Sequence, residues 1–197
     1  MVRELQNYRP RMYCQAVTWS FPEHGWLKCN TDGACRGNPG ESAHGFCIRN
    51  DQGNLVYAEA QEIGIKTNME AETIACLNAL RYCKQMEFHH ILIKTDSLSV
   101  QRVIMKEWKI PWLLAEDIEE IQQLLRITQA QVQHTFREAN QIADKMANLA
   151  IDQGCIIKCQ TFQQLPVGYR RLLNLDKAQI ATLRIRTRRI TSRNTKE

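Results

Sequence analysis

The sequence contains no apolar run close to the roughly 20 residues that a helix needs to cross a bilayer. It also has no CxxC pair among its eight cysteines, no signal peptide and no internal repeat. We therefore expect no membrane segment, reduced thiols in place of a disulfide framework, and an intracellular protein of the nucleus or the cytoplasm. Cys155 and Cys159 lack regular zinc-ligand spacing, which favours a structural role for both.

What is present is typical of one globular domain with terminal extensions. The 197 residues are 44% hydrophobic and 24% charged. Residues 1–25 have no clear periodicity, and we expect them to form a leader segment. A compact domain is expected at 26–152 and a basic C-terminal tail at 153–197. A monomer is the default expectation for the oligomeric state.

Positive charge is concentrated near the C-terminus. Residues 158–197 hold ten Lys or Arg against two acidic residues, whereas the other 157 residues hold 16 basic and 19 acidic residues. The run RIRTRR at 184–189 is the densest part. Such a run favours contact with nucleic-acid phosphates or a nuclear-import receptor, and the alternative is a solvated, partly disordered end.

Hydrophobic periodicity predicts five strands, at 27–32, 45–49, 55–60, 90–95 and 130–136. It predicts helices at 69–84, 97–106, 113–127 and 140–152. Ser97 is expected to cap the second helix, and the turn residues at 50–54 make the second and third strands a hairpin. The order of elements indicates an α/β fold with a five-stranded mixed sheet flanked by helices, in which three antiparallel strands are followed by parallel additions.

Four carboxylates stand where elements begin or end. Asp32 and Asp96 close two of the strands, while Glu72 and Asp144 lie in the first turns of two helices. Such a set can converge at one end of a sheet, where unpaired acids repel one another and need divalent cations to neutralise them. The pattern favours a metal-dependent nuclease site, and the alternative is four unrelated charges at element ends.

Helical periodicity separates two neighbouring glutamates. At 3.6 residues per turn, Glu72 lies on the same stripe as residues 69, 76, 79, 80 and 83, whereas Glu70 lies on the opposite side. An acid on an apolar, sheet-facing stripe has few structural explanations. Glu72 is therefore the predicted ligand, and Glu70 is predicted to be a surface charge.

Four motifs carry a resemblance to a known family. They are TDGACRGNPG at 31–40, TNMEAE at 67–72, KTDS at 94–97 and REANQIAD at 137–144. Together they resemble the signature blocks of type 1 ribonuclease H, and most of all the plant ribonuclease H-like domains related to reverse transcriptases of non-LTR retroelements. The resemblance covers about residues 26–151, nearly the whole predicted domain, and implies a ribonuclease H-like fold.

The resemblance implies a metal-dependent endonuclease that hydrolyses the RNA strand of RNA–DNA hybrids by a two-metal-ion mechanism. Two Mg²⁺ ions, or Mn²⁺ in their place, would be held by Asp32, Glu72, Asp96 and Asp144. Contacts to the hybrid are implied for Gly33, Asn38, Thr67 and Asn68. The stretch 33–40 is expected to be a glycine-rich turn whose amides approach a phosphate, while Asn38 has the alternative of a plain turn residue.

The sequence departs from the family pattern in three places. The loop 137–140 has no histidine, which catalytic members often carry there, and His134 lies inside a predicted strand. Met69 replaces a polar residue, and a basic protruding segment of some relatives is absent. We expect the basic C-terminal tail to supply the phosphate affinity that the absent segment would give. The missing histidine and Met69 favour a second hypothesis, a catalytically weak or inactive retroelement-derived nucleic-acid-binding module. Another nuclease or an integrase on the same fold is a third.

Overall fold

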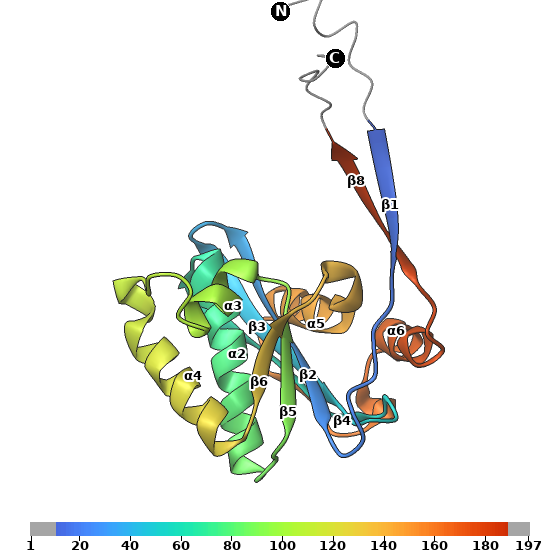
Figure 1. The fold of residues 1–197 in the computed structure, drawn as a ribbon, viewed down its shortest axis with the longest axis horizontal. Helices are drawn as coiled ribbons and strands as arrows, with labels where there is room; N and C mark the ends of the chain where they lie inside the picture. The colour runs from blue at the N-terminus through green and yellow to red at the C-terminus, as the bar shows by residue number, and fades with distance from the viewer. Residues whose placement is uncertain (1–10, 189–197) are drawn as a thin grey trace, which may run out of the picture.

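The structure, a computed structural model, describes residues 11–188 of the chain (Figure 1). The predicted leader at 1–25 and the predicted tail at 153–197 both extend beyond these residues. A central mixed sheet carries helices on both faces, and a separate two-stranded ribbon stands away from the body. None of the helices in this part of the chain is long and apolar enough to cross a membrane.

The central sheet has six strands in the order β6-β5-β2-β3-β4-β7. In chain order they are β2 (Leu27–Gly37), β3 (Gly40–Arg49), β4 (Leu55–Lys66), β5 (Ile91–Thr95), β6 (Gln131–His134) and β7 (Ile157–Cys159). Antiparallel pairs join β2, β3, β4 and β7, whereas β5 and β6 are parallel additions beside β2. The predicted mixed sheet is confirmed. β7 is a sixth strand that was not predicted. It has only three residues, which are too few to show the alternation of polar and apolar residues that identifies a strand.

The helices are α2 (Asn68–Gln85), α3 (Leu98–Ile104), α4 (Ala115–Ile127), α5 (Gln141–Gln153) and α6 (Val167–Lys177), with 3-10 turns η1 (Trp112–Leu114), η2 (Arg137–Ala139) and η3 (Phe162–Gln164). Alternation along β3 builds two cores. Phe46 and Ile48 pack with α2, α3 and α4, and Cys47 packs with α5 and α6 on the other face. Ser97 caps α3 as predicted, because its hydroxyl accepts a hydrogen bond from the Val100 amide.

The stretch 33–40, expected to be a glycine-rich turn, differs in the structure. β2 continues to Gly37, and the chain turns only at 38–39 before β3 begins at Gly40. Gly33 is required for another reason, because a Cβ there would lie 2.2 Å from the backbone nitrogen of Glu72. The missing side chain lets α2 contact β2 directly, which brings Glu72 beside Asp32.

The two ends of the described region pair with each other. β1 (Arg11–Val17) is antiparallel to β8 (Thr182–Arg188), with Val17 opposite Thr182. Leu165 and Leu173 are buried in the core beneath α5, so residues 157–177 of the segment expected to be a tail pack onto the sheet. Local patterns cannot predict the ribbon, because its two strands lie at opposite ends of the sequence.

Gly45 marks a second close approach, between β3 and α5. A Cβ there would lie 2.6 Å from the backbone nitrogen of Ala147 and 2.8 Å from the carbonyl oxygen of Ala143. We expect Gly45→Ala to lower the free energy of unfolding by about 1–3 kcal/mol, because α5 must shift. Gly168→Ala in α6 is the control, since its Cβ would meet nothing within 4 Å and alanine favours a helix. Urea unfolding that finds the two variants equally stable would contradict this packing.

His44 is fully buried on β3, and neither ring nitrogen has a hydrogen-bond partner among residues 11–188. Burial lowers its pKa from 6.5 to about 4. The unfolded chain therefore binds a proton before the folded protein does, so the contribution of His44 to stability is full above pH 6.5 and is lost as the pH falls toward 4.

We expect His44→Leu to remove roughly 2–3 kcal/mol of this acid destabilisation. Urea unfolding gives the free energy of unfolding of wild type and variant at neutral pH and near pH 4.5. The difference between the two proteins should change by this amount between the two pH values. A difference that does not vary with pH would show that His44 does not titrate in this way.

Candidate metal site and nucleic-acid cleft

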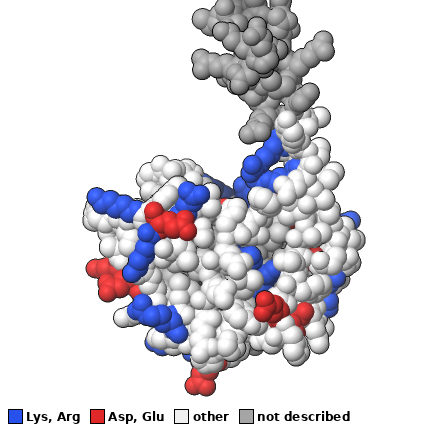
Figure 2. Space-filling model, in the orientation of Figure 1, with Lys and Arg blue, Asp and Glu red and all other residues white. Residues whose placement is uncertain are grey.

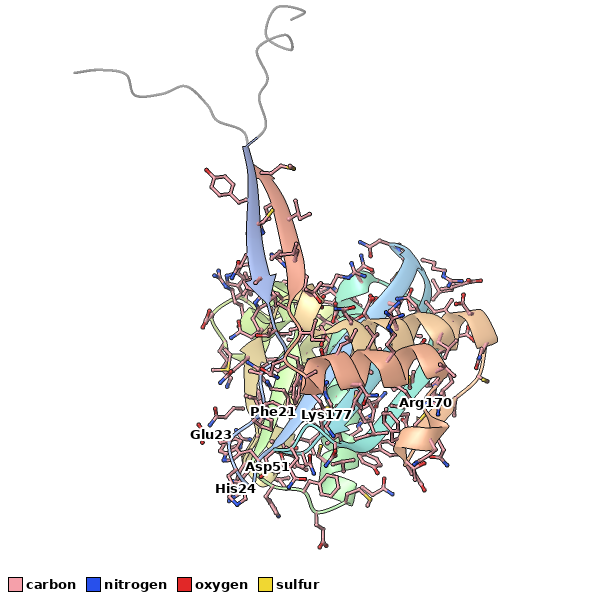
Figure 3. All side chains as sticks on the ribbon, turned by 90° about the vertical axis from the view of Figure 1, so that its right-hand side faces the viewer. Phe21, Glu23, His24, Asp51, Arg170 and Lys177 are labelled. Atoms are coloured by element: carbon pink, nitrogen blue, oxygen red, sulfur yellow. The ribbon has the colours of Figure 1, made fainter. Side chains whose placement is uncertain are left out.

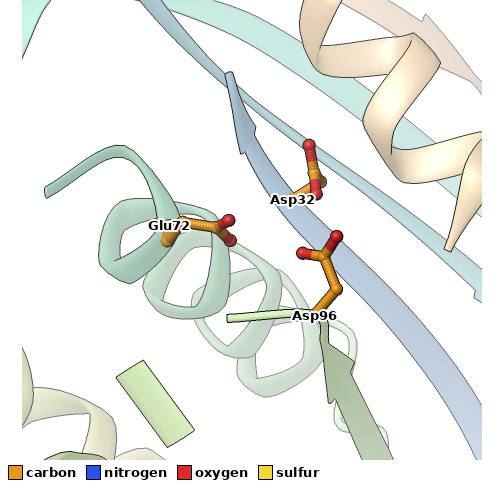
Figure 4. A group of neighbouring side chains, drawn as sticks. All are labelled: Asp32, Glu72 and Asp96. Carbon is orange, nitrogen blue, oxygen red and sulfur yellow. The ribbon is translucent and has the colours of Figure 1, made fainter. Parts of the chain in front are cut away.

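Three carboxylates from different elements converge at one end of the sheet. Asp32 lies on β2, Glu72 in the first turns of α2, and Asp96 directly after β5. β2 and β5 are parallel with Thr31 opposite Thr95, so the next residue on each strand brings its carboxylate to the same place. One oxygen from each of the three lies within 4.8 Å of the others, and Figure 4 shows the side chains around a common space.

Burial and mutual repulsion set the charge of this cluster. Asp32 is 4% exposed, and burial followed by the charges of Glu72 and Asp96 raises its pKa well above the usual range. Burial, and after it the charge of Asp96, raises the pKa of Glu72 to about 8. A divalent cation relieves this repulsion, and carboxylate oxygens are ligands that suit Mg²⁺ and Mn²⁺. The donor set therefore fits a divalent metal ion.

Asp144, the fourth predicted ligand, lines the same cleft but is not among the three clustered carboxylates. It lies in the first turn of α5, where an Nη of Arg137 donates to its Oδ1 at 2.5 Å and Asn148 Nδ2 donates at 3.4 Å. Arg137 belongs to η2, the short loop that lacks a histidine. No sequence pattern predicts this counter-charge, because it depends on how η2 meets α5.

The carboxylates open into a cleft of about 600 Å³ between α2, α3 and α5. Its lining includes all eight predicted site residues: Asp32, Gly33, Asn38, Thr67, Asn68, Glu72, Asp96 and Asp144. Met69 and Arg137 also line it, whereas His134 lies in β6 and is not part of the lining. The structure thus brings the predicted residues together in space, and their roles stay predictions.

Hydrogen bonds hold the three polar residues at the rim of this cleft. Asn38 Oδ1 accepts from the Asn68 amide at 3.0 Å, which ties the β2–β3 turn to the start of α2. Thr67 caps α2, because its hydroxyl accepts from the Glu70 amide while the Glu70 carboxylate accepts from the Thr67 amide. Glu70, predicted to be a surface charge, is therefore a capping residue. It is not part of the carboxylate cluster, as expected from the choice of Glu72.

Asn140 connects Asp32 to the protein interior, and the sequence analysis assigned it no role. Its Nδ2 donates to Asp32 Oδ1 at 3.3 Å and to the Thr31 carbonyl at 2.9 Å. Its Oδ1 accepts from Asn30 Nδ2 at 2.9 Å. Because Asn140 is buried at the start of α5, these bonds fix that helix to β2 and orient the Asp32 carboxylate.

The buried polar network continues through Arg49, which is 1% exposed. Its guanidinium donates to Asn30 Oδ1 at 2.8 Å and to Asp176 Oδ2 at 2.6 Å. It also lies 3.7 Å from the centre of the Trp19 ring. Asp32 is thereby linked through Asn140, Asn30 and Arg49 to α6. The only sequence signal for this network is the presence of polar residues inside otherwise buried strands.

Comparison with known proteins gives a consistent set of matches. A family model described as Reverse transcriptase-like matches residues 30–150. The ribonuclease HI of Halobacterium salinarum is 32% identical over 123 residues, which are 61% of this chain and 62% of that protein. A protein of Arabidopsis thaliana, named "Putative ribonuclease H protein", is 28% identical over 168 residues, which are 81% of this chain and 26% of that protein. The chain therefore spans less than two thirds of both relatives.

Solved structures extend these matches to three dimensions. The crystal structure of LC11-RNase H1 in complex with an RNA/DNA hybrid superposes with a TM-score of 0.61 and 27% sequence identity. The superposition covers 65% of this chain and 98% of that one. The shared part of the fold is thus nearly the whole of the smaller protein, whereas about a third of this chain lies outside the match.

The carboxylate cluster predicts a specific response to metal. In EDTA at pH 8, we expect Glu72→Gln to be more stable than wild type by roughly 2 kcal/mol, because a repelled buried charge is removed. Addition of MgCl₂ should raise the Tm of wild type and not that of Glu72→Gln.

Glu70→Gln on the same helix is the matched control, because glutamine preserves the capping box and leaves the cluster intact. It should respond to Mg²⁺ as wild type does. Thermal unfolding in which Glu72→Gln gains as much from Mg²⁺ as Glu70→Gln would argue against a metal site here.

Proposed function

This chain belongs to the reverse transcriptase-like family, and from the site that it carries we propose that it is a metal-dependent endonuclease that hydrolyses the RNA strand of RNA–DNA hybrids. The observation that supports this most is the cluster of Asp32, Glu72 and Asp96 in an open cleft. Carboxylates this close repel one another unless a divalent cation lies between them. Many nucleases use divalent cations held by carboxylates to hydrolyse phosphodiesters. Residues 26–152 would carry the catalytic groups, while β7 and α6 complete the sheet and its core.

The clustered carboxylates would hold the cations, with Asp144 completing the set. When bound, two Mg²⁺ or Mn²⁺ ions would activate the attacking water and stabilise the leaving oxygen. Asn140 orients Asp32 for this task, and the Gly33 amide orients Glu72 by donating to its Oε2 at 3.3 Å. The protein's part is to keep the ligand oxygens at fixed positions before the substrate arrives.

Arg137 would control the availability of Asp144. Its guanidinium pairs with the Asp144 carboxylate, and a phosphate that enters the cleft would compete for the same guanidinium. Substrate binding would then release Asp144 as a ligand. Arg137 would then act in the loop that lacks a histidine, and it would do so with a permanent positive charge, whereas a histidine would be titratable.

The rim of the cleft would contact the hybrid. Asn38 and Asn68 present amide groups that can bond the backbone of the hybrid and the 2′-hydroxyls by which RNA differs from DNA, and Thr67 lines the cleft with them. The amide of Gly33 donates to Glu72, so Gly33 would contribute to hybrid binding indirectly, by allowing α2 and its rim residues to lie close to β2. The RNA/DNA hybrid bound to LC11-RNase H1 supports a hybrid as the substrate class.

One observation favours a second candidate, a nucleic-acid-binding module with weak or no catalysis. Asp144 is neutralised by Arg137 and stands outside the cluster of three. If a phosphate cannot displace Arg137 from Asp144, the metal site stays incomplete while the cleft still binds a duplex.

Cleavage of a labelled RNA–DNA hybrid in Mg²⁺ or Mn²⁺ tests the proposal, with double-stranded RNA and double-stranded DNA as matched substrates. We expect cleavage of the hybrid alone, and a loss of at least roughly 100-fold in Asp96→Asn because a metal ligand is neutralised. Asp117→Asn on α4 is the control, since that carboxylate does not line the cleft. Wild type and Asp96→Asn that bind hybrid equally and cleave nothing would establish the binding module in place of the enzyme.

A further inference from the structure

The β1–β8 ribbon, formed by Arg11–Val17 and Thr182–Arg188, has two chemically different faces. Residues that are opposite each other in an antiparallel pair project to the same side. Beyond the pair of Val17 and Thr182 at the root, one face carries polar and basic side chains: Tyr13, Gln15, Arg184 and Arg186. The other face carries apolar or thiol side chains: Met12, Cys14, Ala16, Leu183 and Ile185. The ribbon stands clear of the body in two perpendicular views (Figures 1 and 3).

The basic face begins beside the loop at 136–138, one residue of which lines the cleft. Arg184 Nη1 donates to Glu138 Oε2 at 2.7 Å, and its guanidinium lies 4.4 Å from the centre of the Phe136 ring. Gln141 Nε2 also donates to the Thr182 hydroxyl at 3.0 Å. Arg137, which lines the cleft, stands between Phe136 and Glu138 in the chain. The root of the ribbon is thus bound to the same loop that carries a cleft residue.

Arg186 continues this basic face outward. It is exposed and has no acidic partner within 4.0 Å among residues 11–188, in contrast to Arg184. Two residues of strand separate the two arginines by about 7 Å, which sets their side chains along one line that leads away from the cleft. Figure 2 shows basic side chains where the ribbon leaves the body.

Charge complementarity indicates what this line of side chains contacts. The cleft floor is acidic, and the body of the domain between the two ribbon strands, residues 18–181, has 17 basic and 19 acidic residues. A polyanionic duplex therefore gains little attraction from the body of the domain and needs positive charge beside it. The ribbon supplies that charge next to the cleft, together with the phenol of Tyr13, which can donate to a phosphate oxygen.

We propose that the basic face of the β1–β8 ribbon binds the phosphate backbone of the duplex whose other part lies in the cleft. The ribbon would act as a clamp outside the site of hydrolysis, and its contacts would be independent of base sequence. The proposal rests on the proposed function for the duplex in the cleft. The contact itself is with phosphates, so it applies equally to a hybrid and to double-stranded DNA.

The test is the binding of a labelled RNA–DNA hybrid and of a matched double-stranded DNA in EDTA over a range of salt concentrations. We expect Arg186→Gln to weaken both by about three- to tenfold and to reduce the salt slope by about 0.9, the value for one lost phosphate contact. Arg126→Gln, at the exposed end of α4, removes the same charge elsewhere and should change neither quantity.

Arg186 is exposed near the end of the ribbon, so the variant should keep the Tm of wild type, which thermal unfolding checks. Binding and salt slope that are the same in Arg186→Gln and Arg126→Gln would overturn the proposal. The proposal would also be overturned if sedimentation showed that the ribbon joins two copies of the chain and if Arg186→Gln bound the duplex as wild type does. Cleavage activity is measured separately, so a chain that binds through Arg186 without cleaving refutes the proposed enzyme and leaves the clamp intact.

Discussion

The hydrogen bonds of Asn140 are the contacts on which the rest of the site depends. One side chain bonds the Asp32 carboxylate, the backbone of β2 and Asn30, and it does so at the first turn of α5. Buried amide groups cost free energy unless they are paired. The position of α5 on the sheet and the direction of Asp32 are therefore set together, and Arg49 extends the same network to α6.

Two glycines provide the second constraint, because they decide how close the helices come. Gly33 lets α2 touch β2, and Gly45 lets α5 touch β3. The helices that carry Glu72 and Asp144 are thereby drawn toward Asp32, midway along β2, and Asp96, directly after β5. The close approach forces carboxylates together at an electrostatic cost that a divalent cation would offset. Packing and function are thus connected, since the arrangement that destabilises the metal-free protein prepares the site for metal.

Sequence patterns predicted most of the sheet and its helices, because hydrophobic periodicity and capping act over short distances. The stripe that contains Cys76 and Leu80 placed Glu72 toward the sheet. Asp32 and Asp96 do converge, but β2 continues past Asp32 to Gly37, so Asp32 does not close its strand as predicted. The pairing of Asp144 with Arg137 was not predicted, because its geometry depends on how α5 meets η2. The same holds for Asn30 and Arg49, whose partners come from distant segments.

The regions beyond the motifs were the least predictable. β1 and β8 form only because the two ends of the described chain meet, and β7 and α6 pack on a sheet edge that local sequence does not reveal. The strands β1, β7 and β8 are short or lie far apart in the sequence, whereas α6 is an amphipathic helix inside the segment expected to be a tail. Their stability comes from long-range pairing and from apolar residues such as Leu165 and Leu173.

The central claim is that the carboxylate cluster binds divalent metal, and anomalous X-ray diffraction from crystals soaked in MnCl₂ tests it most directly. The account predicts anomalous density bounded by the oxygens of Asp32, Glu72 and Asp96, and the loss of that density in crystals of Glu72→Gln. Density absent from the cluster at saturating Mn²⁺, or equally strong in the variant, would contradict it.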